Sequence, residues 1–145
     1  MKTLWVRAIP VGFGLVGALI FNARAAEPAN PLLYEMTTET LMPHLEENLR
    51  YAVRKEQRCM NQDDLSKVFW MLNEVPLQDC ALVKSMHDAD SALYLLKCSG
   101  GHGTTGDARW KLEPDAITGT LKVRLGGKNM TFYQRITAKP IGACS

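Results

Sequence analysis

The sequence lacks the motifs that mark several common classes of enzyme and membrane protein. It has no Cys-x-x-Cys pair, so nothing indicates a thioredoxin-like redox site, and its four cysteines are too dispersed for a structural zinc site. It has no Gly-x-Ser-x-Gly sequence, which is the nucleophile elbow of the α/β-hydrolases. Its apolar run at residues 8–21 covers 14 residues, whereas a helix needs about 20 to span a bilayer. None of these classes is therefore supported.

The first residues have the pattern of a secretory signal peptide. Lys2 and Arg7 provide a positive start, the apolar run at 8–21 follows, and small residues precede a cleavage point after Ala25. Pro10 and several glycines make the run a poor permanent helix. We expect export of the Gram-negative type to the periplasm or the medium, with no stable membrane span after cleavage.

The remaining 120 residues are enough for one domain with a modest core. Residues 26–30 are expected to form a flexible lead, and 31–145 a single domain. Residues 1–25 contain three of the 17 basic residues and none of the 15 acidic ones, so cleavage leaves a formal charge of −1. This balance argues against nucleic acid as a partner.

Strict alternation of apolar and polar residues dominates the second half of the chain. The alternating runs lie at 81–86, 92–98, 107–113, 117–125 and 130–137. Alternation places one set of side chains on a core face and the other set in water. Pro114-Asp115 and Gly126-Gly127 lie between runs and favour tight turns. The fold class is therefore mainly β, with an antiparallel meander that curls into an open barrel or half-barrel.

One short helix is predicted from Asn61 onward. Asn61 is a favourable N-cap, and Asp63 and Asp64 would lie at the positive end of the helix dipole. An apolar stripe at helical spacing follows, comprising Leu65, Val68, Phe69 and Leu72. Pro76 lies beyond the expected end. We expect this helix to cover one face or end of the sheet.

Residues 41–58 allow two structures. Leu41, Leu45, Leu49 and Val53 recur at every fourth residue, which favours a helix. The alternation of Leu49, Tyr51 and Val53 favours a strand instead. The residues alone leave helix and strand open.

Several short motifs follow one another along the chain: Pro31–Thr37, Cys59-Met60, Asp79-Cys80, Cys98 with the glycine-rich stretch after it, Ile117–Leu121 and Lys139–Cys144. Their order resembles a known family of small exported bacterial proteins, domain of unknown function 3617. The resemblance covers nearly all of the chain after residue 25. Leu33-Tyr34 replaces the family's Leu-Trp pair, and the charged 45–58 segment replaces a stretch that is often rich in proline and methionine. The resemblance implies strands before Cys59, and it implies no activity.

Two disulfides are expected, because an even number of cysteines in a small exported domain usually pairs. Cys80 and Cys98 are equidistant from the centre of the predicted hairpin at Ala89, so they should face each other across two strands. Cys59 would then pair with Cys144. The alternative is Cys59–Cys80 with Cys98–Cys144.

Two features could carry chemistry. The glycine-rich loop at 99–106 lacks the Lys-Ser/Thr ending of a phosphate-binding loop and precedes a strand, so a hairpin connection is the better interpretation. His87 and His102, with Asp88 and Asp90, are weak candidates for a metal-handling or hydrolytic site, because a cluster such as the one around His87 is more often a solvated turn.

The functional hypothesis is a non-catalytic envelope protein that binds a small apolar ligand or another envelope protein. No catalytic residue and no cofactor is predicted. The sheet face that would line a ligand cup, or form a filled core, carries Trp110, Leu121, Val123, Met130 and Phe132. Two alternatives are the histidine site and a structural module that pairs through a sheet edge.

Overall fold

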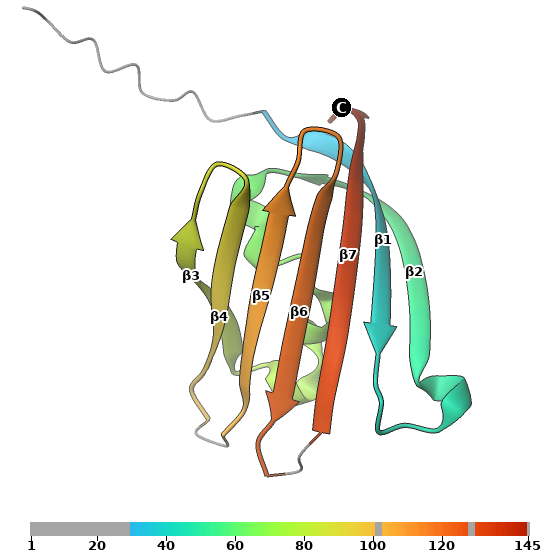
Figure 1. Ribbon diagram of the computed structural model, residues 1–145, viewed down its shortest axis with the longest axis vertical. Helices are drawn as coiled ribbons and strands as arrows, with labels where there is room; N and C mark the ends of the chain where they lie inside the picture. Colours follow the sequence, from blue (N-terminus) through green and yellow to red (C-terminus); the bar gives the residue numbers. More distant parts are fainter. Residues whose placement is uncertain (1–29, 101–102, 128–129, 145) are drawn as a thin grey trace, which may run out of the picture.

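A computed structural model describes residues 30–100, 103–127 and 130–144, and it shows one antiparallel sheet (Figure 1). The seven strands are β1 (Leu32–Leu41), β2 (Tyr51–Met60), β3 (Cys80–His87), β4 (Ser91–Cys98), β5 (Thr105–Leu112), β6 (Ile117–Leu125) and β7 (Met130–Ala143). Their order is β2-β1-β7-β6-β5-β4-β3, so β3 to β7 form the predicted meander and β1 pairs with β7. The sheet does not close, and β2 and β3 are its edges. The mainly β prediction is confirmed.

Residues 41–58, for which the sequence left helix and strand open, belong to strands β1 and β2 and the turn between them. β1 and β2 pair antiparallel, from Leu32 opposite Met60 to Leu41 opposite Tyr51. Only η1 (Glu47–Leu49), a single 3₁₀ turn, lies between them. Pairing with β7 buries alternate residues of β1, which a solvent-exposed helix at this position would not achieve.

The predicted short helix is replaced by three 3₁₀ helices. These are η2 (Gln62–Ser66), η3 (Trp70–Asn73) and η4 (Val75–Leu77). The predicted cap is present, because Asn61 Oδ1 accepts from the Asp63 amide at 2.8 Å. The backbone is extended at Phe69 and Glu74, which interrupts helical hydrogen bonding. An α-helix this short is marginal on its own, so burial of side chains from several sides of the segment decides the conformation.

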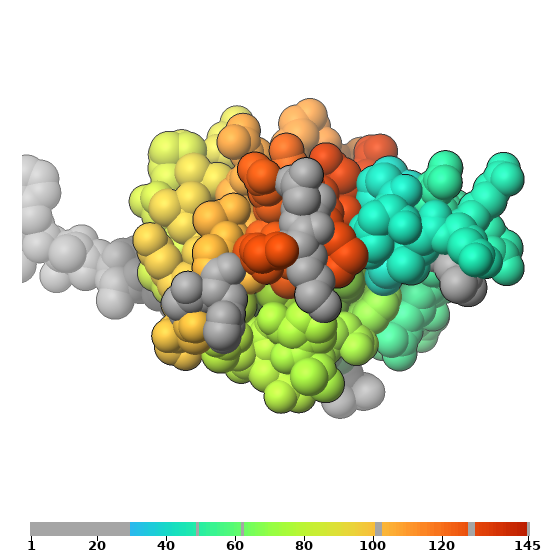
Figure 2. All heavy atoms as spheres, turned by 90° about the horizontal axis from the view of Figure 1, so that it is seen from below, coloured from blue at the N-terminus to red at the C-terminus, as the bar shows by residue number. Residues whose placement is uncertain are grey.

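The segment from residue 61 to 79, called here the 3₁₀ segment, covers one face of the sheet, called the inner face. Seen end-on, the strands arch over it (Figure 2). Leu65, Phe69 and Leu77 of this segment are almost completely buried. The centroid of the Phe69 ring lies 5.2 Å from the centroid of the Trp110 ring on β5. The core therefore lies between the inner face and the 3₁₀ segment.

The face predicted to line a cup or form a core is mostly filled core. Trp110, Leu121, Val123 and Phe132 are all less than 8% exposed. Met130 is half-buried at the beginning of β7. On the inner face, open space remains at the end of the sheet where β7 begins.

Both disulfides have the favoured pairing. Cys80 and Cys98 lie directly opposite each other on β3 and β4 and are bonded. Cys59 near the end of β2 is bonded to Cys144, with a Cα–Cα distance of 5.8 Å. The alternative pairing is excluded. Each bond holds an edge strand to the body of the sheet.

Candidate functional site

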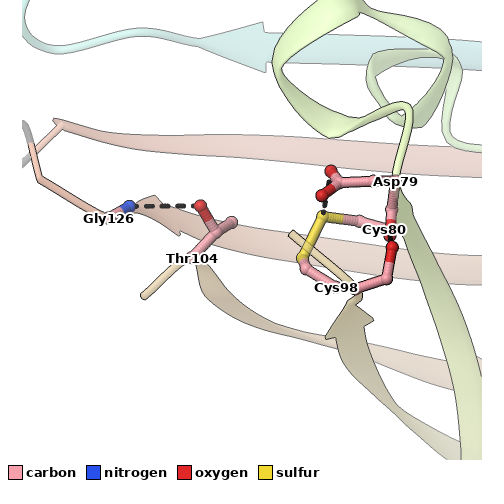
Figure 3. The surroundings of a disulfide bond; sticks show 6 residues. Asp79, Cys80, Cys98, Thr104 and Gly126 are labelled. Atoms are coloured by element: carbon pink, nitrogen blue, oxygen red, sulfur yellow. Dashed lines mark hydrogen bonds between the residues drawn. A yellow bond between two sulfur atoms is a disulfide. The ribbon is translucent and has the colours of Figure 1, made fainter. Parts of the chain in front are cut away.

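Three adjoining clefts lie along the 3₁₀ segment at the end of the sheet where β4 and β6 finish and β5 and β7 begin. The first, the disulfide cleft, has a volume of about 250 Å³. It is lined by Pro76, Asp79, Cys98, Thr104, Leu125, Gly126 and Met130. Figure 3 shows two of its walls, with Asp79 beside the Cys80–Cys98 bond on one side and the hydrogen-bonded pair Thr104 and Gly126 on the other. This cleft is small and partly polar.

The second, the apolar cleft, shares Pro76, Leu125 and Met130 with the first. Its volume is about 360 Å³, within the usual range for small-ligand sites of roughly 300–1,000 Å³. Apart from Glu74, its lining is apolar or aromatic: Met42, Trp70, Met71, Pro76, Leu77, Leu125, Met130 and Phe132. Three of these are methionine, whose flexible side chain adapts to different apolar shapes. Chemically, this cleft suits an aliphatic or aromatic group.

The third, the polar cleft, lies between the 3₁₀ segment and the hairpin of β1 and β2. Its volume is about 300 Å³, and it is lined by Thr38, Thr40, Ala52, Val53, Arg54, Trp70 and Glu74. Trp70 and Glu74 line the apolar cleft as well. The two clefts therefore meet at these two side chains and together offer an apolar and a polar compartment.

Buried polar groups lie beside the polar cleft. Thr38, Thr40 and Gln134 are each at most 4% exposed, although they occupy the inner face. Gln134 Nε2 donates to Thr40 Oγ1 at 3.0 Å. Gln134 Oε1 and Trp70 Nε1 are buried and have no hydrogen-bond partner among the described residues. An unsatisfied buried polar atom costs about 1–3 kcal/mol. Trp70 lines the polar cleft, whereas Gln134 lines none of the three clefts.

Formal charges surround the polar cleft without dominating it. Arg54 lies on the side of β2 that faces the cleft, opposite Thr38. Its guanidinium is 3.7 Å from the Glu56 carboxylate, and the Arg54 side chain is 64% exposed. Glu74 adds an exposed negative charge. Among the described residues that line the cleft, no buried ion could therefore balance a charged ligand.

The histidine candidates do not form a site in the described part of the chain. His87 ends β3 and is exposed, and Asp88 and Asp90 are exposed in the following turn, where the Asp88 amide donates to the Ser91 carbonyl at 2.8 Å. His102 lies outside the described residues. Within those residues, no group of three or more His, Cys, Asp or Glu side chains converges as metal ligands would.

The glycine-rich loop connects β4 to β5, as a hairpin interpretation requires. Gly103 has a φ of +70°, and the Thr104 hydroxyl accepts from the Gly126 amide at 3.2 Å. This contact ties the loop to the end of β6. Residues 101 and 102 lie outside the described part.

Sequence reasoning did not identify Trp70 or Thr40 as site residues, nor the buried Gln134 that donates to Thr40. One signal was visible, since Gln134 occupies a core-facing position in the run from Met130 to Ile136 where the other residues are apolar. Trp70 gave no such signal, because an aromatic residue in an apolar segment usually indicates core.

No family model, curated protein or solved structure matches this chain. The resemblance to domain of unknown function 3617 therefore stays a prediction. Among the described residues, no helix has the length and apolar character required to cross a membrane. Two disulfides indicate that the domain folds in an oxidising compartment.

Proposed function

We propose that this chain is an exported cell-envelope protein that binds a small ligand with an apolar body in the apolar cleft. The proposal includes cleavage after Ala25 and residence in the periplasm or the medium. The observation that carries it is a concave apolar surface of ligand size that remains open beside a filled core. The two disulfides support export.

Binding is favoured over catalysis by the side chains around the clefts. Among the described residues that line them, none is a histidine, and the only cysteine, Cys98, is in a disulfide. The two carboxylates lie apart, Glu74 at the junction and Asp79 in the disulfide cleft. A nucleophile with an adjacent base is therefore not assembled there.

The test is calorimetric titration of the oxidised protein with 1-decanol, combined with a variant that fills the cleft. Met130 lines both the apolar and the disulfide clefts, so Met130→Trp should reduce affinity at least tenfold. Met86→Trp is the matched control, because Met86 is 49% exposed on β3 and lines none of the three clefts. Undetectable binding by the parent protein, or equal loss in both variants, would overturn the proposal.

A second candidate is a structural module that pairs a partner's strand with β3. Val83 and Met86 are about half-exposed on this edge, whereas the β2 edge carries charged residues from Arg54 to Arg58 that discourage pairing. The irregularity between Lys84 and Met86 limits the length available. Periplasmic crosslinking from position 83 should capture an envelope protein, and loss of that product in Lys84→Pro but not in Lys55→Pro would place the contact on β3.

A further inference from the structure

The side of the sheet that faces away from the 3₁₀ segment, called here the outer face, concentrates the positive charge of the domain. Along β4 to β7 the outward positions alternate with the buried ones. These positions carry seven exposed basic side chains and one acidic one: Lys97, Arg109, Lys111, Lys122, Arg124, Arg135 and Lys139, against Asp107. The 3₁₀ segment on the opposite side carries four acidic side chains and one basic one: Asp63, Asp64, Glu74 and Asp79, against Lys67. The nearly neutral total charge therefore hides a basic face and an acidic face.

The basic side chains form a strip that follows the crest of the arch. Arg109, Thr120 and Arg135 lie side by side on β5, β6 and β7, and β6 is the middle strand of the seven. Neighbouring strands are about 4.8 Å apart, so the strip is about 10 Å wide. Along the strands it extends from Arg124 on β6 to Lys139 on β7, which is about 27 Å at about 3.4 Å per residue. In Figure 2 these strands lie over the 3₁₀ segment.

Two shallow clefts open between the side chains of this strip. The larger has a volume of about 360 Å³, and its lining includes Arg109, Lys122 and Arg135. The smaller has a volume of about 330 Å³, and its lining includes Lys122 and Arg124. Asp107 lines both clefts, and its carboxylate accepts from Arg109 Nε at 2.9 Å. Each cleft therefore has more cationic than anionic side chains, as a site for a phosphate group requires.

We propose that the outer face binds the surface of a bilayer that contains anionic phospholipids, with lipid phosphate groups in these two clefts. Charge complementarity identifies an anionic partner. The shape identifies a flat one, because a plane touches an arch along its crest, and the basic strip follows that line. Tyr133 is 39% exposed beside Lys122 and supplies an amphipathic ring of the kind that favours the head-group layer. This inference concerns another surface than the apolar cleft and does not depend on the proposed ligand.

The largest share of the attraction falls on Lys122 and Arg135. A basic residue close to an anionic leaflet strengthens binding roughly fivefold, and the effect fades within a Debye length of about 8 Å at physiological salt. Lys111 is paired with Glu113 at 2.7 Å, whereas Lys122 and Arg135 form no ion pair with another described residue. Glu39 on β1 lies opposite Arg135, but its Oε1 accepts from the Tyr51 hydroxyl at 2.7 Å. Lys122 and Arg135 are therefore the residues to change.

The experiment measures sedimentation of the protein with vesicles of phosphatidylcholine alone and with about 30% phosphatidylglycerol. The protein is recovered from the periplasm with its disulfides intact, and every variant has the same N-terminus, so any contribution of residues 1–29 cancels between variants. We expect the partition coefficient to be at least tenfold higher with phosphatidylglycerol, and to fall at least tenfold between 50 and 300 mM NaCl. Equal binding to both kinds of vesicle, or binding to neither, would overturn the inference.

A matched pair of variants separates the outer face from net charge. Lys122→Glu/Arg135→Glu should lower the partition coefficient at least tenfold at 150 mM NaCl. Arg58→Glu/Lys67→Glu changes the net charge equally, at exposed positions on the inner side of β2 and on the 3₁₀ segment, and should change binding less than threefold. If the first variant does not fold, the corresponding glutamine variants replace both, with at least threefold loss expected at the outer face. Equal losses in the two members of a pair would contradict the inference.

Protection of lysines from acetylation reports which side meets the bilayer. With vesicles containing phosphatidylglycerol, acetylation of Lys122 and Lys139 should slow at least fivefold, while acetylation of Lys67 should not change. Protection of Lys67 without protection of Lys122 would refute the proposed orientation. Binding of soluble polyphosphate by a protein that binds no vesicles would identify a polymer as the partner of the strip and would overturn the bilayer.

Discussion

A single added methyl group at Gly119 tests how the core holds the 3₁₀ segment in place. Gly119 on β6 lies directly opposite Trp110 on β5. A Cβ atom at position 119 would lie 2.5 Å from Cζ3 of the Trp110 ring and within 2.7 Å of two further ring carbons. The ring is 3% exposed and packs against Phe69 of the 3₁₀ segment, so it has little room to move.

Two effects of Gly119→Ala oppose each other, and their magnitudes decide the sign. Alanine restricts the unfolded chain more than glycine does, which stabilises a compatible strand position by about 0.4–1 kcal/mol. Overpacking in a well-filled core costs about 1–3 kcal/mol. The overlap with three aromatic carbons belongs to the upper part of that range. We therefore expect a net loss of about 1–2 kcal/mol.

Equilibrium unfolding in urea, with the disulfides intact, measures this loss. For an m-value of about 2 kcal/mol/M, the midpoint should fall by about 0.5–1 M. Gly142→Ala is the control, because a Cβ there has no neighbour within 4 Å. Only the effect on the unfolded chain remains, so its midpoint should rise by about 0.2–0.5 M. Adding Trp110→Phe to Gly119→Ala should relieve the overlap and make the two substitutions non-additive. A midpoint for Gly119→Ala at or above that of the parent protein would refute the reasoning.

Three further variants test separate features. Tyr94→Phe should add about 1 kcal/mol at pH 7, because the buried Tyr94 hydroxyl has no partner among the described residues. Burial, with a smaller contribution from the Asp63 carboxylate, raises the pKa of Tyr94 in the folded protein. The unfolded chain therefore loses the phenol proton near pH 10 while the folded protein still holds it, so the free energy of unfolding falls as the pH rises from the unfolded pKa through the folded pKa. Tyr94→Phe should reduce this loss of urea stability between pH 9 and 11. Asn61→Ala removes the cap on η2 and should lower the free energy of unfolding by about 1 kcal/mol in the same assay. A decrease below about 0.3 kcal/mol would contradict the capping role of Asn61. Cys80→Ala/Cys98→Ala should lower the free energy of unfolding by about 3 kcal/mol. It should also weaken 1-decanol binding at temperatures where circular dichroism still reports a folded sheet. Unchanged affinity would show that the clefts do not depend on this disulfide.

The five strands from β3 to β7 were predictable because their signals are local. Alternation depends only on which face of the sheet is buried. In the run from 117 to 125, Ile117, Gly119, Leu121 and Val123 are buried, while Thr120, Lys122 and Arg124 are exposed. The turn after this run contains Gly127, whose φ is +78°. The pairing of Cys80 with Cys98 followed from the same hairpin geometry.

The 3₁₀ segment and the clefts were not predictable because they depend on tertiary packing. The stripe from Leu65 to Leu72 suits an α-helix, yet Met71 and Leu77 are also buried and lie off that stripe. Burying all of these side chains requires a backbone of interrupted 3₁₀ turns instead of one continuous α-helix. The clefts arise where this path leaves the sheet, so their lining residues come from separate parts of the chain that no short motif connects.

The positions of the disulfides explain why an open sheet can keep a ligand-sized opening without losing its cover. The 3₁₀ segment begins just after Cys59, which is bonded to the far end of β7, and it ends just before Cys80, which is bonded to β4. Hydrogen bonds within the segment are few and short-range, since it contains only 3₁₀ turns. The two bonds therefore hold both ends of the element that carries Trp70, Glu74 and Pro76, while buried side chains such as Phe69 and Leu77 pack its middle against the inner face. Because Trp70 lines two clefts and Pro76 lines two, release of either end would displace walls of the candidate site before the hydrogen-bonded strands separate, which links the proposed binding to an oxidising compartment through geometry.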